Sequence, residues 1–316
     1  MKKIIQFHTF YVLGILIFSI FISCKSSSVT IKTIQIKPPA EDFVRIEGAV
    51  INTAVKGSEV FIENRSLVIP SLYVCEHEVT QGEYTEFCIF RNIWDDDVMG
   101  PDYPAYHVTW YDALVYCNLR SIAEGLEPVY KINGTTDPAK WNDIESNNDK
   151  NNPRFKAPNV SPEWDKVICD FNAGGYRLPT DAEWEYIARG GNGGLPDEQF
   201  ICAGSNNPDE VAWLARNCSG GEAEWNHPHI IKTKKPNPYG IYDLNGNVDE
   251  WCWDFYGEIS ASTKVTGPES GKNRVYRGGG STTIRSYTNL TFRGGEEISP
   301  NNMGNTMGLR VVRIAK

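Results

Sequence analysis

The chain has 316 residues, of which 41% are hydrophobic and 22% charged, so it can bury a full-sized core and lacks the composition of a disordered protein. Its formal net charge is −9 and its basic residues are scattered, which excludes the basic stripe of a nucleic-acid-binding surface. We therefore expect one large globular domain and no nucleic-acid partner.

The first 23 residues have the pattern of a lipoprotein signal peptide. Lys2 and Lys3 precede an apolar run over residues 11–22, which is short for a membrane span. The run ends in Phe21-Ile22-Ser23-Cys24, which resembles a bacterial lipobox in its looser form. This resemblance implies cleavage before Cys24 and acylation of that cysteine, and several acyl chains would give durable anchoring. The alternative is an ordinary secretory signal in which Cys24 is incidental.

Residues 24–41 lack periodicity and include Pro38-Pro39, so we interpret them as a lipidated tether before a domain over residues 42–316. Cysteines in that domain are odd in number once Cys24 is assigned to lipid, so they cannot all pair. Cys117 and Cys252 lie in apolar surroundings and are predicted to be buried free thiols. Cys202 and Cys218 flank a polar loop and form the candidate disulfide bridge.

Short apolar runs at residues 44–46 and 60–62 are typical of strands. Three helices are predicted to begin after Thr80, Thr109 and Thr180, and a glutamate three residues beyond the first and third threonines completes a capping box. Residues 132–172 are rich in Asn, Asp, Lys and Pro and are interpreted as a surface excursion. Strands are predicted again at 275–277 and 309–312. Few helices, many short strands and long loops indicate a mixed α+β domain.

Several motifs occur in an order and spacing that resemble the formylglycine-generating enzyme family, also called the sulfatase-modifying factor domain. These motifs are Glu78-Val79-Thr80, 107–113 (HVTWYDA), 176–185 (YRLPTDAEWE), 238–243 (PYGIYD), 246–251 (GNVDEW), Arg277-Gly278-Gly279 and Gly308-Leu309-Arg310. The resemblance covers the chain from Phe43 to its end. It implies an elaborated C-type lectin-like fold with long loops and few helices.

The same resemblance implies that catalysis is absent. The enzymes carry a copper-binding cysteine pair between Arg-Gly-Gly and Gly-Phe-Arg, whereas residues 281–307 contain no cysteine. The two positions fall near Tyr287 and Phe292, and neither side chain offers the thiolate that Cu(I) needs. We therefore expect no copper and no formylglycine-generating activity.

The stretch from Arg277 to Arg310 looks like the variable region of proteins diversified by a diversity-generating retroelement. It is rich in residues reachable from Asn codons by changing adenines, and with the lipobox the whole chain resembles surface lipoproteins of the Treponema variable protein type. Hydroxyl, amide and aromatic side chains suit adaptable recognition. An ordinary solvated loop is the alternative interpretation. The predicted ligand-binding residues are Ser281, Thr282, Thr283, Ile284, Ser286, Tyr287, Asn289, Thr291, Phe292, Asn301, Asn302 and Asn305.

A second candidate site lies in residues 243–250. The carboxylates of Asp243 and Glu250, with the carbonyl oxygens of Gly246 and Val248, make a hard oxygen set suited to Ca²⁺, and the resemblance implies a structural calcium at this motif. A simple Asn-Gly turn at Asn245 is the alternative.

Together these features predict a monomeric lipoprotein, anchored in the outer membrane and exposed on the cell surface, whose C-terminal segment binds an unknown protein or surface ligand. Two alternatives stay open at this stage. One is a structural envelope or secretion-associated lipoprotein, and the other is an enzyme of unfamiliar chemistry on the same fold, which would show a deep pocket with a strongly perturbed pKa.

Overall fold

The computed structural model describes residues 41–88, 100–141, 164–190, 200–215, 217, 227–297 and 306–316. The chain divides into two compact units, Met1–Gln35 and Ile36–Lys316, and all described residues belong to the second. The predictions for Cys24, Cys218, Asn301, Asn302 and Asn305 therefore lie outside the described residues.

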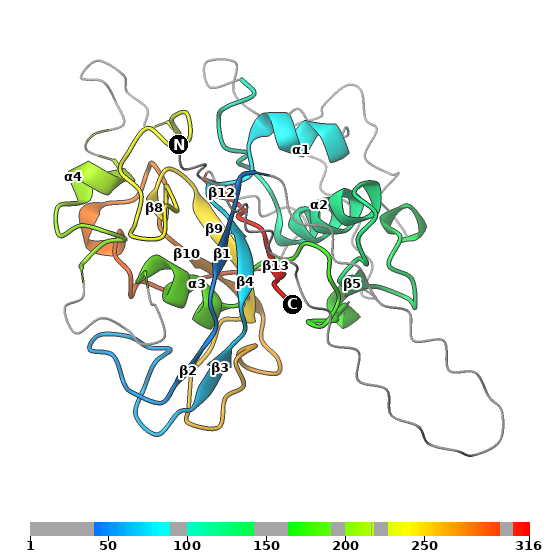
Figure 1. Cartoon of the computed structure of the whole chain (residues 1–316), viewed down its shortest axis with the longest axis horizontal. Coiled ribbons are helices and arrows are strands. Elements are labelled where there is room, and N and C mark those ends of the chain that lie inside the picture. Colours follow the sequence, from blue (N-terminus) through cyan, green and yellow to red (C-terminus); the bar gives the residue numbers. More distant parts are fainter. Residues whose placement is uncertain are drawn as a thin grey trace, which may run out of the picture. The chain divides into compact units, whose positions relative to one another are not determined.

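Two sheets of different strand order form the centre of the domain (Figure 1). The first joins the two ends of the domain, because β4 (Leu72–Cys75) pairs antiparallel with both β1 (Phe43–Ile46) and β13 (Val312–Ile314). The second has the order β11 (Gly294–Glu297), β10 (Asn273–Arg277), β9 (Asp249–Phe255), β12 (Met307–Gly308), with β12 parallel to β9. The C-terminal region thus contributes strands to both sheets.

The remaining described elements are short. Two-stranded ribbons are formed by β2 (Ala49–Ile51) with β3 (Leu67–Ile69), β5 (Tyr130–Lys131) with β6 (Ile168–Cys169), and β7 (Ala212–Trp213) with β8 (Asn245–Gly246). The α-helices are α1 (Gln81–Phe87), α2 (Trp110–Ala123), α3 (Asp181–Ala188) and α4 (Pro208–Val211), and the 3₁₀ turns are η2 (Pro138–Lys140), η4 (Trp164–Lys166) and η5 (Arg285–Tyr287). In Figure 1, α1 and α2 lie together on one side of the central strands and α4 lies on the other.

The three predicted helix starts are confirmed. Thr80, Thr109 and Thr180 are the N-caps of α1, α2 and α3, and each accepts a hydrogen bond from the backbone N–H three residues later. The middle helix also has a complete capping box, with Asp112 in place of a glutamate. Since N-capping depends on residues three apart, it can be predicted from local sequence.

Two strand predictions needed correction. Residues 60–62 form no strand, because the Ser58 hydroxyl accepts hydrogen bonds from the backbone N–H groups of Val60 (3.1 Å) and Phe61 (2.9 Å) and closes a turn there. Residues 309–311 belong to no strand, because β12 ends at Gly308 and β13 begins at Val312; in between, the carbonyls of Leu309 and Val311 accept from the N–H groups of Val79 and Cys75.

The core consists of two clusters of buried apolar side chains, one around α2 and one around α3. Trp110, Trp184 and Trp251 are buried, and Trp253 is partly buried against the first cluster. Arg177 pairs with both carboxylate oxygens of Glu183 at 2.6 and 2.8 Å, so these two buried charged side chains satisfy each other.

Two tryptophans within the predicted surface excursion are part of the core. Trp141 and Trp164, which border the part that is not described, are both buried and lie edge-to-face with ring centroids 5.3 Å apart. The aromatic contact therefore closes the base of the excursion.

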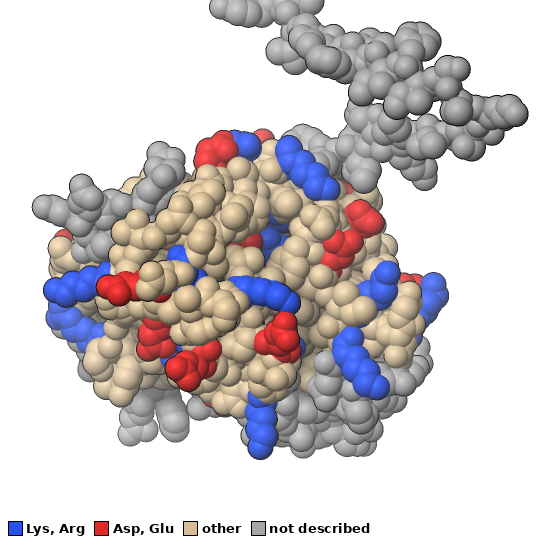
Figure 2. Space-filling model, turned by 90° about the horizontal axis from the view of Figure 1, so that it is seen from below, with Lys and Arg blue, Asp and Glu red and all other residues tan. Residues whose placement is uncertain are grey.

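Cys117 and Cys252 are buried free thiols, as predicted. Cys202 is also a buried free thiol, so the bridge predicted from it to Cys218 finds no support. Within the described part of the chain, no helix is long and apolar enough to cross a membrane. Basic and acidic side chains are interspersed on the face shown in Figure 2.

Candidate binding site in the C-terminal segment

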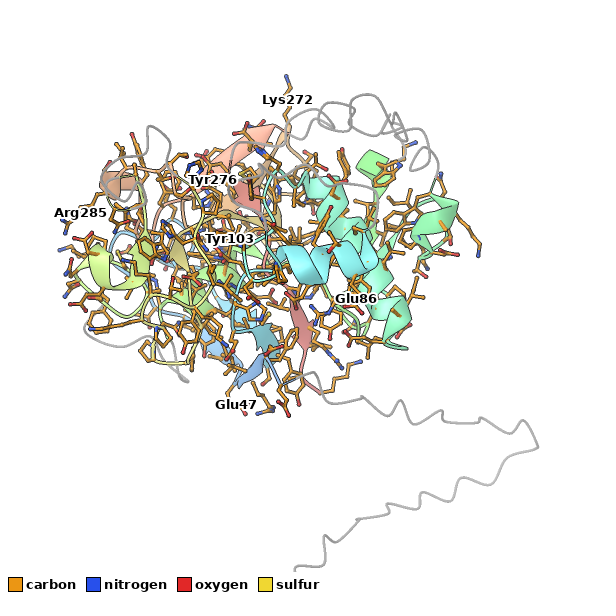
Figure 3. The ribbon with its side chains drawn as sticks, turned by 90° about the horizontal axis from the view of Figure 1, so that it is seen from above. Glu47, Glu86, Tyr103, Lys272, Tyr276 and Arg285 are labelled. Atoms are coloured by element: carbon orange, nitrogen blue, oxygen red, sulfur yellow. The ribbon has the colours of Figure 1, made fainter. Side chains whose placement is uncertain are left out.

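The C-terminal segment, residues 281–307, leaves β10 through two glycines that local geometry requires. Gly278 and Gly279 have φ values of 88° and 75°, in the left-handed region that side chains disfavour. A Cβ on Gly279 would also lie 3.0 Å from the Thr283 side chain. The turn directs the chain to the edge of the molecule, where Arg285 of η5 projects outward (Figure 3).

The side chain of Arg277 connects the C-terminal segment to α3. Its fully buried guanidinium donates to Asp181 (2.6 Å) and Glu185 (2.6 Å) of α3, and also to the backbone carbonyls of Leu290 (3.1 Å) and Phe292 (2.8 Å). One side chain therefore connects the helix to two points of the segment. Charge-assisted hydrogen bonds of this kind are shorter and stronger than neutral ones.

Further anchors are distributed along the segment. The backbone N–H of Ser281 donates to the Asn247 carbonyl (2.8 Å), and the N–H of Leu290 donates to the Ile201 carbonyl (2.9 Å). Arg293 donates to Asp181 at 2.6 Å. The segment is thus fixed at its start and again at residues 290–293.

Cys202 lies under this segment, where its Sγ donates to the Thr288 carbonyl at 3.3 Å. Burial raises the pKa of the Cys202 thiol to about 11, so it stays protonated at neutral pH. Its observed contact is a structural one.

Between the anchors, the predicted ligand-binding residues separate into exposed and supporting groups. Thr282, Ile284, Ser286 and Tyr287 are exposed, and Ile284 and Tyr287 have exposed fractions of 56% and 51% although their side chains are apolar or aromatic. Large exposed apolar side chains in one loop are a property of interaction surfaces.

Ser281 does not belong to the exposed group. It is fully buried and therefore supports the loop instead of meeting a ligand, because the chain turns inward there to reach Asn247. Asn289 is half-buried and its amide spans the loop: it donates to the Ser286 carbonyl and accepts from the N–H groups of Thr291 and Phe292.

A cavity of about 380 Å³ opens beside the exposed residues. Its lining includes Thr282, Thr283, Ile284, Tyr287 and Phe292 from the predicted site, and its other walls are Asp249, Tyr276, Glu296, Thr306 and Met307. Its volume falls in the range of small-molecule and side-chain pockets. Five predicted residues are therefore brought to one concave surface.

Tyr287 and Phe292 meet inside this cavity, with ring centroids 5.2 Å apart. These are the two positions that the family resemblance aligned near the enzymes' cysteine pair. Two aromatic rings in contact offer rigid apolar area for recognition, and neither ring can ligate Cu(I).

A second cavity of about 560 Å³ is lined by another part of the same segment. Asn289, Leu290 and Thr291 line it together with Phe200 and Ile201, which have exposed fractions of 44% and 58%. The segment thus contributes residues to two cavities.

Sequence reasoning overlooked Asp249, which forms a wall of the first cavity. It is buried, and its Oδ2 accepts a 2.6 Å hydrogen bond from Thr306. Burial raises the pKa of the Asp249 carboxyl to about 7, the nearby charge of Glu296 adds to the rise, and the bond from Thr306 opposes it. An acidic residue within the buried motif 246–251 was the sequence signal that could have indicated this group.

The two carboxylates predicted to bind calcium, Asp243 and Glu250, have different hydrogen-bond partners in the structure. Glu250 is engaged elsewhere, because its carboxylate accepts from Arg310 (2.7 Å) and from the Trp184 indole (2.7 Å). Asp243 does offer an acceptor: its Oδ1 is buried without a hydrogen-bond partner, while its Oδ2 accepts from Lys232 N at 2.7 Å. No group of three or more Asp, Glu, His or Cys side chains in the described ranges could hold a metal ion.

Glu250 is thus paired with an arginine in this structure, and its role as a calcium ligand stays a prediction. An orphaned carboxylate oxygen is the kind of group that Ca²⁺ satisfies, with backbone carbonyls completing such a site. Calcium at Asp243, with the carbonyls of Gly246 and Val248, stays a prediction.

The comparisons with known proteins agree with this architecture. The family model of the sulfatase-modifying factor enzyme 1-like domain matches residues 31–315. Chaperone protein LppX of Paenibacillus barcinonensis is 35% identical over 293 residues, which cover 87% of this chain and 90% of the relative. The formylglycine-generating enzyme of Streptomyces coelicolor is 31% identical over 166 residues, which cover 48% of this chain and 50% of that enzyme.

Among solved structures, Treponema denticola variable protein 1 is similar with a TM-score of 0.69 and 27% identity, covering 86% of this chain and 95% of that protein. The predicted α+β fold of the formylglycine-generating enzyme type is therefore confirmed. The chain belongs to the sulfatase-modifying factor enzyme 1-like domain family.

Proposed function

We propose that this protein is a surface-displayed lipoprotein that binds a ligand through its C-terminal segment and catalyses no reaction. The observation that carries the proposal is the cavity of about 380 Å³, whose walls come mostly from that segment. The exposed residues of that segment lie between Ser281 and Leu290, whose backbone N–H groups are hydrogen-bonded to other parts of the domain. The segment therefore has a fixed path and a free surface.

Similarity to Treponema denticola variable protein 1 over most of both chains supports a variable binding surface. The lipobox at residues 21–24 supports acylation of Cys24 and attachment to the outer membrane. The absence of cysteine from residues 281–307 and the aromatic pair Tyr287 and Phe292 support a binding role over formylglycine chemistry.

The first test is to sequence the genomic region downstream of the gene and the gene itself in many isolates. We expect a near-copy of the Arg277–Arg310 codons that differs at adenines, beside a reverse transcriptase gene. Substitutions should concentrate at the exposed residues 282–287 and spare Arg277, Leu290 and Arg293. Uniform variation across anchors and exposed positions, or no variation, would remove the diversified binding site.

The lipid anchor is tested separately. We expect labelled fatty acid to be incorporated into the wild-type protein and lost in Cys24→Ala, while protease added to intact cells digests the wild-type chain. Incorporation that persists in Cys24→Ala would contradict the lipobox assignment.

A second candidate function is assistance in the folding of another exported protein. It is favoured by one observation, the 35% identity to chaperone protein LppX over nearly the full length of both chains. If the chain is a chaperone, deleting its gene should lower the amount of the active exported protein that it helps to fold. Isolates should then show no selective variation at residues 282–287. Selective variation without a secretion defect decides for diversified binding.

A further inference from the structure

The cavity beside the C-terminal segment has two acidic residues in its lining. Asp249 of β9 and Glu296 of β11 line it, and none of the described lining residues is a lysine or arginine. The Oδ2 atom of Asp249 accepts a hydrogen bond from Thr306, and no described side chain donates to its Oδ1.

A basic side chain does occur nearby, but it is directed elsewhere. Arg274 precedes Tyr276 by two residues on β10, and its guanidinium stacks on the rings of Trp110 (3.9 Å) and Phe255 (3.5 Å) and donates to the Trp253 carbonyl at 2.5 Å. Arg274 does not line the cavity. Arg274 lies across the β10–β11 ladder from Glu296, and its guanidinium is held by these aromatic rings and the Trp253 carbonyl.

Three aromatic rings also line the cavity. Phe292 lies between Tyr276 and Tyr287, with ring centroids 6.1 and 5.2 Å apart, and all three rings line the space. Tyr276 lies directly over Gly294, where a Cβ would come within 2.0 Å of the ring. Tyr276 is labelled on β10 in Figure 3. The glycine therefore fixes the position of one wall.

Carboxyl groups and aromatic rings in one cavity match a particular kind of occupant. A cation is attracted to the negative face of an aromatic ring and to a carboxylate, and an aliphatic stem fills the apolar part of such a space. The net charge of −9 favours the approach of basic ligands over acidic ones.

We propose that this cavity receives the ammonium or guanidinium group of a lysine or arginine side chain from a protein ligand. The inference rests on the proposed binding function and names the chemistry of that same site. In this proposal the carboxyl groups of Asp249 and Glu296 attract the charge, and the rings of Tyr276, Phe292 and Tyr287 contact the cation and its aliphatic stem; all five residues line the cavity.

The test uses the full chain, purified in a non-ionic detergent, and short capped peptides that differ at one central residue: lysine, arginine, norleucine or glutamine. Binding is measured by titration calorimetry at about pH 8.5, where Asp249 is ionised. We expect the lysine or arginine peptide to bind at least about tenfold more tightly than the norleucine peptide, in line with desolvated cation–aromatic contacts. Asp249→Asn should reduce this preference to below about threefold.

Glu269→Gln is the matched control. It removes an exposed carboxylate that pairs with Lys264 away from the cavity and should leave the preference unchanged. A wild-type chain that binds all four peptides equally, or none of them, overturns the cation pocket. Equal loss of preference in Asp249→Asn and Glu269→Gln also overturns it, because the effect then comes from overall charge.

The outcomes separate this inference from the proposed function. If Tyr287→Ala abolishes the binding of every peptide while none is preferred, the binding site stands and the cation pocket fails. If Tyr287→Ala and Asp249→Asn change no binding, the proposed site itself fails.

Discussion

Replacing Arg277 by methionine should destabilise the whole domain. The change keeps an unbranched side chain in place but removes the donors to Asp181, Glu185 and the two carbonyls of Leu290 and Phe292. Each carboxylate, however, retains another arginine.

The magnitude follows from that partial compensation. Arg293 still donates to Asp181 and Arg189 still donates to Glu185, both within 2.7 Å, so neither carboxylate becomes an isolated buried charge. Breaking a buried ion pair costs about 3–5 kcal/mol, and we expect the lower end, about 3 kcal/mol. The carbonyls of Leu290 and Phe292 also lose their donor, which adds to the loss of stability.

The measurement is urea unfolding of the wild type and Arg277→Met, followed by the fluorescence of the tryptophans, with the midpoint compared at an unchanged slope. Lys264→Met removes an exposed ion pair to Glu269 and serves as the control, with no measurable change expected. A destabilisation below about 1 kcal/mol in Arg277→Met would refute the view that this side chain anchors the segment.

Three further predictions concern capping, pH and calcium. Thr180→Ala removes the N-cap acceptor of α3 and should lower stability by about 1 kcal/mol, measured by the urea midpoint; an unchanged midpoint would contradict the cap. Burial raises the pKa of Asp249 in the folded state, and the charges of Glu296 and Glu250 add to the rise. The contribution of Asp249 to stability is therefore present at low pH and is lost as pH rises towards about 7. Asp249→Asn should therefore gain stability relative to wild type from about pH 4 to pH 7, by at most about 4 kcal/mol at about 1.4 kcal/mol per pKa unit, and a pH-independent difference would show that folding does not shift this pKa. Millimolar Ca²⁺ should raise the Tm of the wild type and not of Asp243→Ala, and an equal response of both would exclude calcium at Asp243.

The parts of the fold that sequence could predict are those set by neighbouring residues. Thr80, Thr109 and Thr180 cap their helices with residues three positions later, and the apolar spacing that follows is local too. The strand around Val275 was likewise visible from a short run. Residues 60–62 had the same composition as a strand, but one hydroxyl two residues earlier was enough to bend the chain.

The support of the site could not be predicted, because it depends on contacts between distant positions. Arg277 and Asp181 are separated by 96 residues, and Arg310 and Glu250 by 60. Sequence placed Glu250 among calcium ligands since a carboxylate in a turn motif suits calcium, and the arginine that occupies it became visible only in the fold. The same holds for Asp249, whose place in a cavity wall follows from the pairing of β9 with β12.

The anchors show how one fold can hold a loop of changing sequence. Arg277 and Cys202 bond to the backbone carbonyls of Leu290, Phe292 and Thr288, and any residue type supplies a carbonyl. Substituting Phe292 would therefore change the cavity wall without removing the hydrogen bond that fixes the chain. Side-chain identity is constrained where the side chain itself is buried, as for Leu290, because a polar group there would lose its water without gaining a partner. Attachment through the backbone and exposure of side chains together make variation at the binding surface compatible with a stable domain.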